Sequence, residues 1–312
     1  MNGSPEGVLV LGFGGPSPGC CGRRADCARQ PGVEARCFVS GILGDRAEQA
    51  ARIEAVVAHY ERLGGYSPYN RLAAAQCAAL ARELQRRGRA ARCALGLRHW
   101  SPWIGEACAQ LAGCARVAAL ILAPHAQGPL AEAYARAVTL PVRWAEPWHL
   151  HPGFIAAWAE RCQEALLGGE PALWEGAALL CTAHALPRAV ARAARYEELV
   201  AESARALAAA LGGRPCRIAY QSAPEAPSTP WTEPLLAPAL AELAAAGARA
   251  VVLAPLGFLV DHLEVLYDLD IAAQETARAL GLRLRRASTP GEHPGLICAL
   301  ADAVEEALDR PG

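Results

Sequence analysis

The sequence contains no lysine, so all 30 of its basic residues are arginines, and they are scattered along the chain. The 31 acidic residues nearly balance them and leave a net charge of −1. Proteins that bind nucleic acid through its phosphates concentrate positive charge on one face or in one segment. The charge pattern therefore gives no indication of a nucleic-acid partner.

Long apolar runs are also missing, since no stretch of 18 apolar residues occurs. A helix that spans a membrane needs about 20 of them. The first residues, Met1–Gly7, lack the basic and apolar regions of a signal peptide. We therefore expect a cytoplasmic protein without integral membrane association, and we expect it to be a monomer.

Two further absences concern nucleotides, because neither a Gly-x-Gly-x-x-Gly sequence nor a P-loop occurs. The remaining composition is that of a globular protein, with 53% hydrophobic residues in a chain of 312. That length suggests two domains or one large domain with a substantial core. We expect no nucleotide cofactor.

Cysteine, in contrast, is abundant, and twelve would be many for structural disulfides in a cytoplasmic chain. Eight are isolated within strand or helix patterns, where cysteine acts as a small apolar residue. The other four lie in a loop rich in glycine, proline and arginine, residues 17–43; they are Cys20, Cys21, Cys27 and Cys37. Four thiolates could hold an iron–sulfur cluster or a structural zinc, or they could remain unliganded.

Short apolar strands alternate with helical patterns through the chain, and this alternation occurs twice. The predicted strands are 8–13, 92–97, 117–124 and 142–144 in the first half, and 178–183, 217–221, 250–255 and 282–285 in the second. Such a series predicts parallel sheets with helices on both faces. We predict an α/β fold of two similar doubly wound, Rossmann-like domains, each with a four-stranded parallel sheet, facing a central cleft. The predicted domains are 1–147 and 148–312, and a helix at 294–308 closes the second.

The segment 249–270 contains the highest density of candidate functional residues. An apolar strand, 250–255, leads into an acidic segment in which Asp261, Glu264 and Asp268 have the spacing of one helix face, with His262 beside them. Such a face can hold a divalent cation beyond the carboxyl end of a buried strand. The alternative is a solvated acidic first turn that complements the helix dipole. His184 follows another predicted strand and would face the same cleft, which favours a functional site.

Six short motifs, in this order, resemble those of ferrochelatases, the enzymes that insert Fe(II) into a porphyrin. They are Leu11–Pro16, Gly64–Pro68, Gly96–His99, Ala183–Pro187, Tyr220–Ser222 with Pro230 and Trp231, and Asp261–Tyr267. The resemblance runs over almost the whole chain and is greatest to the soluble members that use coproporphyrin III. It implies a lyase of haem biosynthesis that converts coproporphyrin III to coproheme. The alternatives are a chelatase for protoporphyrin IX or another tetrapyrrole or metal, and a non-catalytic porphyrin or haem carrier.

The resemblance also implies roles for single residues. His184 and Glu264 would be catalytic and would handle the Fe(II) substrate, with Asp268 as a further metal contact. An imidazole can accept a pyrrole proton while a carboxylate orients the metal or water. The implied porphyrin contacts are Phe13, Ser67, Arg98, His125, Tyr134 and Trp231.

The chain departs from the family pattern in three places. Phe13 stands where related soluble enzymes have a tyrosine that can approach the metal, His59 stands where they have arginine, and Ala272 interrupts the carboxylate series. We therefore expect neither an axial ligand at Phe13 nor an outer metal-relay site. Some ferrochelatases carry a 2Fe-2S cluster on extra cysteines, so the resemblance favours such a cluster on Cys20, Cys21, Cys27 and Cys37.

Overall fold

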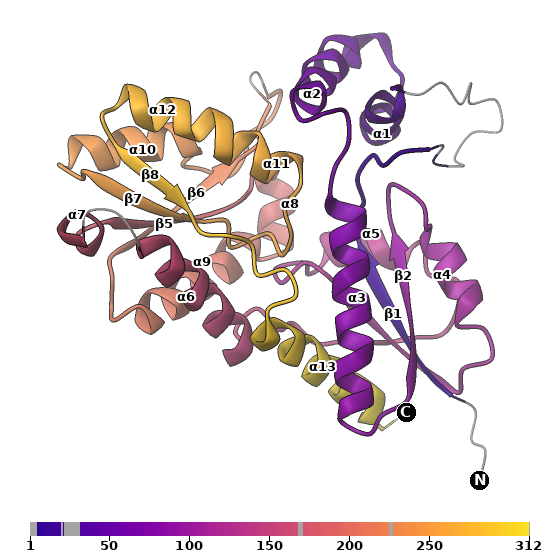
Figure 1. Cartoon of the computed structure of the whole chain (residues 1–312). Coiled ribbons are helices and arrows are strands. Elements are labelled where there is room, and N and C mark those ends of the chain that lie inside the picture. Colours follow the sequence, from indigo (N-terminus) through magenta and orange to yellow (C-terminus); the bar gives the residue numbers. More distant parts are fainter. Residues whose placement is uncertain (1–4, 20, 22–31, 168–170, 225–226, 312) are drawn as a thin grey trace.

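The computed structural model describes residues 5–19, 21, 32–167, 171–224 and 227–311. It contains two four-stranded sheets, each flanked by helices (Figure 1). Every paired strand runs parallel to its neighbour. The predicted α/β fold with two doubly wound halves is therefore confirmed.

The first sheet has the strand order β2-β1-β3-β4. Its strands are β1 (Glu6–Gly12), β2 (Ala91–Leu97), β3 (Arg116–Ile121) and β4 (Arg143–Trp144). The helices between them are α3 (Tyr69–Arg86), α4 (Ile104–Gln110) and α5 (Pro129–Ala135). Because the strands are parallel, their carboxyl ends all meet at one edge of the sheet.

The second sheet repeats this arrangement in the order β6-β5-β7-β8. Its strands are β5 (Ala178–His184), β6 (Cys216–Gln221), β7 (Ala250–Ala254) and β8 (Arg283–Arg286). Its helices are α7 (Pro171–Glu175), α8 (Arg188–Ala193), α9 (Tyr196–Ala210), α10 (Leu236–Ala245), α11 (Leu263–Leu266) and α12 (Ala273–Ala279), with a π-helical turn at Asp268–Ala272 before α12. The strand boundaries agree closely with the apolar runs of the sequence.

Both faces of each sheet are buried, which explains why the strands read as continuous apolar runs. In β1, Val8 and Val10 contribute to one apolar cluster while Leu9 and Leu11 contribute to another. All four side chains are 0% exposed. Burial of each contributes about 1.5–3 kcal/mol relative to an exposed side chain.

Two long helices join the halves, α6 (Pro152–Leu166) and α13 (Pro294–Asp309). They pack against each other, and α13 then runs back along α3 and β3 of the first sheet (Figure 1). The sequence predicts a closing helix at 294–308, which is α13, but it predicts no helix at α6. The division at residue 147 stays a prediction, and the contacts of α13 with the first sheet bear directly on it.

The two helices begin in the same way, with the sequence His-Pro-Gly. His151 Nδ1 accepts the Gly153 N–H at 3.1 Å, and His293 Nδ1 accepts the Gly295 N–H at the same distance. The backbones touch here, since a Cβ on Gly153 would lie 2.3 Å from the Gly295 oxygen. Only glycine permits this approach.

Each capping histidine also bonds to the other helix. His151 Nε2 lies 2.9 Å from Asp302 on α13, and His293 Nε2 lies 2.9 Å from Glu160 on α6. In both helices the acidic residue lies nine positions after the histidine that caps its own helix. The joint between the halves is therefore reciprocal.

The predicted loop 17–43 is wrong for its second part, because residues 34–43 form helix α1 (Glu34–Leu43). Ala35, Phe38 and Val39 are buried and have the spacing of one helix face. A second helix, α2 (Ala50–Arg62), follows a short 3₁₀ turn at Ala47–Gln49. Within the described ranges, no helix is long and apolar enough to cross a membrane.

Candidate active site at the strand ends

His184 and Glu264 meet at the carboxyl edge of the second sheet. His184 is the last residue of β5, and Glu264 lies in the first turn of α11, after β7. His184 Nδ1 lies 3.0 Å from Glu264 Oε2, and the two side chains are 33% and 32% exposed. The contact is a close ion pair rather than a well-aligned hydrogen bond. Because both side chains are partly exposed, both groups are open to a ligand.

Gly257 allows this approach, because it lies in the turn between β7 and α11 and packs on β5. A Cβ at Gly257 would lie 3.0 Å from the Cβ of Ala183, the residue before His184. The Gly257 N–H also donates to the Thr182 carbonyl at 3.1 Å. The turn is thus held against the strand that carries His184.

His262 and Asp261 lie outside the shared carboxylate face that the sequence predicted. The His262 side chain caps α11, accepting the Glu264 N–H at 3.1 Å. Asp261 precedes the cap and instead accepts from Thr289 at 3.0 Å and from Arg286 at 3.3 Å. The prediction of three carboxylates on one face is therefore wrong for Asp261, because the helix begins two residues later than the spacing requires.

The electrostatics of the ion pair favour its charged form. Burial alone raises the pKa of Glu264, but His184 outweighs it and lowers that pKa to about 2. Burial likewise lowers the pKa of His184, whereas the carboxylates of Glu264 and Asp268 raise it above its ordinary value. A carboxylate partner makes an imidazole a stronger proton acceptor.

A second carboxylate lies at the start of the π-helical turn. Burial raises the pKa of Asp268 to about 7, and the negative charge of Glu264 adds to that shift. The Ser222 hydroxyl, from the end of β6, donates to Asp268 Oδ2. Ser222 holds this position with a positive φ of 68°, which is strained for a residue with a side chain.

Gln221, the residue before Ser222, supports the same helix. Its Nε2 donates to the Glu264 carbonyl at 2.5 Å, and its side chain is buried. The sequence indicates that Gln221 and Ser222 belong to a motif at a strand end, but it predicts no role for them. Its role in contacting α11 depends on β6 and β5 being neighbours, which no local pattern reports.

Residues of the first half form the other side of the site. The Phe13 ring is 38% exposed, and its centroid lies 4.6 Å from that of His99 and 6.3 Å from that of Phe38. Tyr60, on α2, is buried, and burial followed by the charges of Glu264 and Asp268 raises its pKa. Its phenol therefore lies within electrostatic range of the acidic helix.

Helix α2 also contacts the second half directly. The His59 ring stacks on Tyr267, with centroids 3.7 Å apart and planes at 15°. Arg62 donates to the Tyr267 hydroxyl at 3.3 Å and lies 3.9 Å from Glu275. His59, which departs from the family pattern, thus belongs to a contact between the halves.

The predicted porphyrin contacts of the first half differ in accessibility. Ser67 and Tyr134 are buried, while the exposed Arg98 guanidinium lies 5.8 Å from the centre of the Tyr134 ring. His125 is 2% exposed, and its Nε2 lies 3.0 Å from Ser203 Oγ on α9. Arg98 is therefore the accessible group of the four, and a porphyrin contact at His125 stays a prediction that this geometry does not support.

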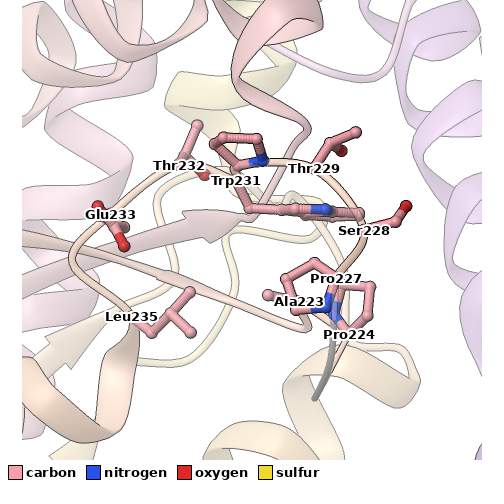
Figure 2. A pocket seen from close by; sticks show the side chains of 10 residues that line it. Ala223, Pro224, Pro227, Ser228, Thr229, Trp231, Thr232, Glu233 and Leu235 are labelled. Atoms are coloured by element: carbon pink, nitrogen blue, oxygen red, sulfur yellow. The ribbon is translucent and has the colours of Figure 1, made fainter.

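Trp231 lies in the loop between β6 and α10, where it lines a cavity of about 420 Å³. Figure 2 shows its indole in the middle of that lining, with Pro224, Pro227 and Leu235 around it. The next residue, Thr232, accepts the Leu186 N–H at 3.1 Å. Because Leu186 follows His184 closely, the loop of Trp231 borders the candidate active site.

Two of the four clustered cysteines lie within the described residues. The Cys21 side chain is buried, and its carbonyl accepts from Trp103 Nε1 at 2.8 Å. Cys37 lies on α1 and packs against the same apolar cluster. Cys20 and Cys27 lie outside the described residues, so the predicted 2Fe-2S cluster stays a prediction.

Comparison with known proteins identifies the family of the chain. The family model described as Ferrochelatase matches residues 33–308. A protein named coproporphyrin III ferrochelatase from Nocardia farcinica is 34% identical over 97% of this chain and 88% of its own length. A protein of the same name from Mycolicibacterium smegmatis is 31% identical, covering 97% and 90%. A ferrochelatase from Deinococcus radiodurans is 30% identical, covering 97% and 96%.

The solved structures agree in fold. The sirohydrochlorin chelatase SirB from Bacillus subtilis subspecies spizizenii, in complex with cobalt, has a TM-score of 0.51 over 98% of this chain and 97% of its own. Its sequence identity is 14%, so this likeness concerns the fold alone.

Proposed function

Because the chain belongs to the ferrochelatase family, we propose that it inserts Fe(II) into coproporphyrin III to give coproheme. The observation that carries the proposal is the 3.0 Å contact between His184 and Glu264 at the sheet edge. Metal insertion releases two pyrrole protons, so it needs a proton acceptor near the metal path. An imidazole beside a carboxylate meets that need without a nucleotide or a redox cofactor.

The three polar groups have separate tasks in this proposal. In its neutral form, His184 accepts a pyrrole proton at one ring nitrogen, while the Glu264 carboxylate stabilises the imidazolium that forms and attracts the incoming Fe(II). Asp268, fixed by Ser222, lies one turn further along the helix and provides a second oxygen contact for the metal. Oxygen and imidazole donors both suit Fe(II).

The aromatic side of the site fits the porphyrin itself. Phe13 presents an exposed ring, and a planar macrocycle gains contact area from aromatic faces. Phe13 has no oxygen that can bind a metal, so the proposal assigns proton transfer and metal handling to the His184 side alone. A macrocycle held bent between the two sides would expose its nitrogen lone pairs to the metal.

The preference for coproporphyrin III rests on two observations. The relatives from Nocardia farcinica and Mycolicibacterium smegmatis carry that substrate in their names. The exposed Arg98 guanidinium beside Tyr134 suits a propionate, since Arg binds carboxylates well. Coproporphyrin III has four carboxylates and protoporphyrin IX has two, so an arginine at the rim favours the former.

The test is an anaerobic assay of the purified chain with Fe(II) and either porphyrin, read by loss of free-porphyrin fluorescence. We expect a higher kcat/KM for coproporphyrin III. The Glu264→Gln variant, which keeps the shape but removes the charge, measures insertion without the ion pair. Equal or better kcat/KM for protoporphyrin IX would reject the substrate assignment, and equal rates with and without protein would reject the activity.

A further inference from the structure

A pair of thiols lies between β5 and β6, away from the candidate active site. Cys181 Sγ and Cys216 Sγ are 3.3 Å apart. Cys181 is fully buried, whereas Cys216 begins the edge strand β6 and is half-buried. One thiol can therefore be reached from solvent while its neighbour cannot.

We propose that Cys181 and Cys216 form a redox-active dithiol, which a peroxide converts to a reversible disulfide through initial attack by Cys216. This inference goes beyond the proposed function, because neither thiol takes part in metal insertion. It follows from the contact distance, the unequal exposure and the position of the two strands.

The two thiols also differ in reactivity, and the more exposed thiol, Cys216, is the more reactive one. A thiolate, not a thiol, attacks a peroxide. The contact with the Cys181 sulfur lowers the pKa of Cys216, while that same contact and burial raise the pKa of Cys181. Cys216 is thus the attacking residue, and Cys181 is the resolving one.

The chemistry is a two-step oxidation. The Cys216 thiolate attacks hydrogen peroxide, breaks its O–O bond, and gives a sulfenic acid and hydroxide. The Cys181 sulfur then displaces the sulfenic oxygen as water, and its own proton leaves with that water. In total, two thiols lose two electrons to one peroxide, which is reduced to two waters. A dithiol reductant reverses the step by thiol–disulfide exchange.

Disulfide formation requires movement of the edge strand. Cys181 pairs with Ile218 and Cys216 pairs with Leu179, so the two cysteines lie diagonally across the strand pair. A disulfide bond is about 2.0 Å long and needs close backbones. Gly212 and Gly213, in a turn just before β6, leave the start of the strand adjustable. Because the two cysteines lie diagonally, we expect the resulting bond to be strained, and strained disulfides are the ones that reductants open readily.

Movement of β6 against β5 would also displace the opposite ends of these two strands. β5 ends at His184, and β6 ends at Gln221, the residue that bonds the Glu264 carbonyl. A shift of β6 against β5 therefore changes the support of the ion pair. We expect the oxidised protein to insert metal at least several-fold more slowly than the reduced protein, with recovery on reduction.

The primary test does not depend on activity. The full chain, reduced and then exposed to hydrogen peroxide, is alkylated with N-ethylmaleimide and mapped as non-reduced peptides. We expect a peptide linked through Cys181 and Cys216 that disappears after dithiothreitol. In Cys181→Ala, Cys216 should advance to sulfinic acid. In Cys216→Ser, the fast loss of thiol should slow at least tenfold.

Cys298 provides the matched control, because it is also half-buried and lies on another element, α13. Cys298→Ser should keep both the linked peptide and the fast phase. The proposal is overturned if no Cys181–Cys216 peptide forms, or if Cys216 links instead to Cys162. A linked peptide with unchanged metal insertion would overturn the coupling to the active site. If the chain does not insert metal at all, the proposed function fails, and the peptide map alone then decides whether the dithiol forms a disulfide.

Discussion

At the scale of single residues, His184 is the side chain on which the proposed reaction depends most. We expect His184→Ala to bind porphyrin normally, because the aromatic contacts lie on the other side of the site. Metal insertion should slow by at least about a hundredfold, which is the scale for loss of a positioned proton acceptor. Porphyrin binding and insertion are measured separately, by fluorescence titration and by the anaerobic assay.

His262 offers the control for this experiment. It is a histidine two residues from Glu264, but its side chain caps the helix and packs against the rings of Phe258 and Tyr69. His262→Asn keeps a capping group, since asparagine is a favoured N-cap residue. Insertion by this variant should stay within a few-fold of the parent rate, and an equal loss in both variants would mean that the whole helix, not His184, had been disturbed.

His125 predicts a pH dependence of stability. Burial, with a smaller effect of the charge on His149, lowers the pKa of His125 to about 3. Ser203 donates its hydroxyl to the His149 carbonyl, so His125 Nε2–H donates to Ser203. His125 Nδ1 then meets no partner among the described residues, and an added proton there would stay unpaired.

The direction of this pH dependence follows from the pKa values of His125 in the folded and unfolded chain. The unfolded chain takes up the proton near the ordinary pKa of about 6.5, whereas the folded chain resists it down to about 3. The stabilisation is complete above pH 6.5 and is lost as the pH falls from there toward 3. Between pH 7 and pH 5, His125→Gln should lose less unfolding free energy than the parent, by up to about 2 kcal/mol. Urea denaturation at both pH values measures the difference, and parallel curves for the two proteins would contradict it.

At the scale of elements, the backbones of α6 and α13 approach each other closely where the two helices cross. Gly153→Ala would place a methyl group 2.3 Å from the Gly295 oxygen, and backbone atoms cannot yield as a flexible side chain can. We expect a loss of about 1–3 kcal/mol, the usual cost of overpacking, visible as a lower thermal midpoint.

Gly105→Ala is the matched control, because Gly105 also lies in a helix and a Cβ there meets nothing within 4 Å. That change should be neutral or should stabilise by up to about 1 kcal/mol, given the helix propensity of alanine. If both variants behaved alike, the contact between the helices would be looser than its geometry indicates.

The four clustered cysteines give another prediction at this scale. We propose that Cys20, Cys21, Cys27 and Cys37 bind a 2Fe-2S cluster, and that this cluster adds to the stability of the fold, as metal binding does in other proteins. Protein purified anaerobically should be brown, and a serine at any one position should remove the colour and lower the thermal midpoint. Analysis for iron and acid-labile sulfide is the measurement, and colourless protein with one zinc per chain, or with no metal, would rule the cluster out.

The sequence predicted the strands well, because strands buried on both faces leave unbroken apolar runs. It does not predict α6, and it does not predict α1, which lies in the second part of the predicted loop 17–43. Helix α11 begins later than the carboxylate spacing suggests. Local periodicity indicates which residues are buried. It indicates the first residue of a helix less well when a side chain such as His262 forms the cap.

The candidate site was predictable only where its residues lie at strand ends. His184 and Glu264 follow strands β5 and β7, and parallel strands bring such residues together. Asp261 was misplaced because its partner, Arg286, comes from β8, which the helix pattern cannot anticipate. The bond between Ser222 and Asp268 likewise joins positions far apart in sequence. It also needs a positive φ at Ser222, and a serine in the sequence does not indicate such a φ.

At the scale of the whole molecule, α13 completes the half of the protein from which it is most distant in sequence. Leu300, Val304 and Leu308 are 0% exposed, and the Leu308 carbonyl accepts from Arg116 and Arg143 of the first sheet. Deletion of residues 294–312 should therefore expose the first sheet more than the second. Hydrogen exchange should show lost protection in β1 and β3 and retained protection in β5 and β7.

Deletion of residues 310–312 alone is the control, since α13 ends at Asp309 and the shorter deletion should leave the exchange pattern unchanged. Loss of protection in all strands after the longer deletion would mean that the two halves unfold as one cooperative unit. Preserved protection in β1 and β3 would mean that α13 is dispensable to the first sheet.

The return of α13 to the first sheet also has a consequence for synthesis. β1 to β4 leave the ribosome long before α13 does, so the nascent first half carries an uncovered apolar face while the whole second half is translated. Domains made in sequence order usually fold as they emerge, but we expect the earlier half of this chain to complete its folding only after α13 has been made. A chaperone that shields apolar surface should bind nascent chains stalled near residue 150, and it should be released only once α13 has cleared the exit tunnel.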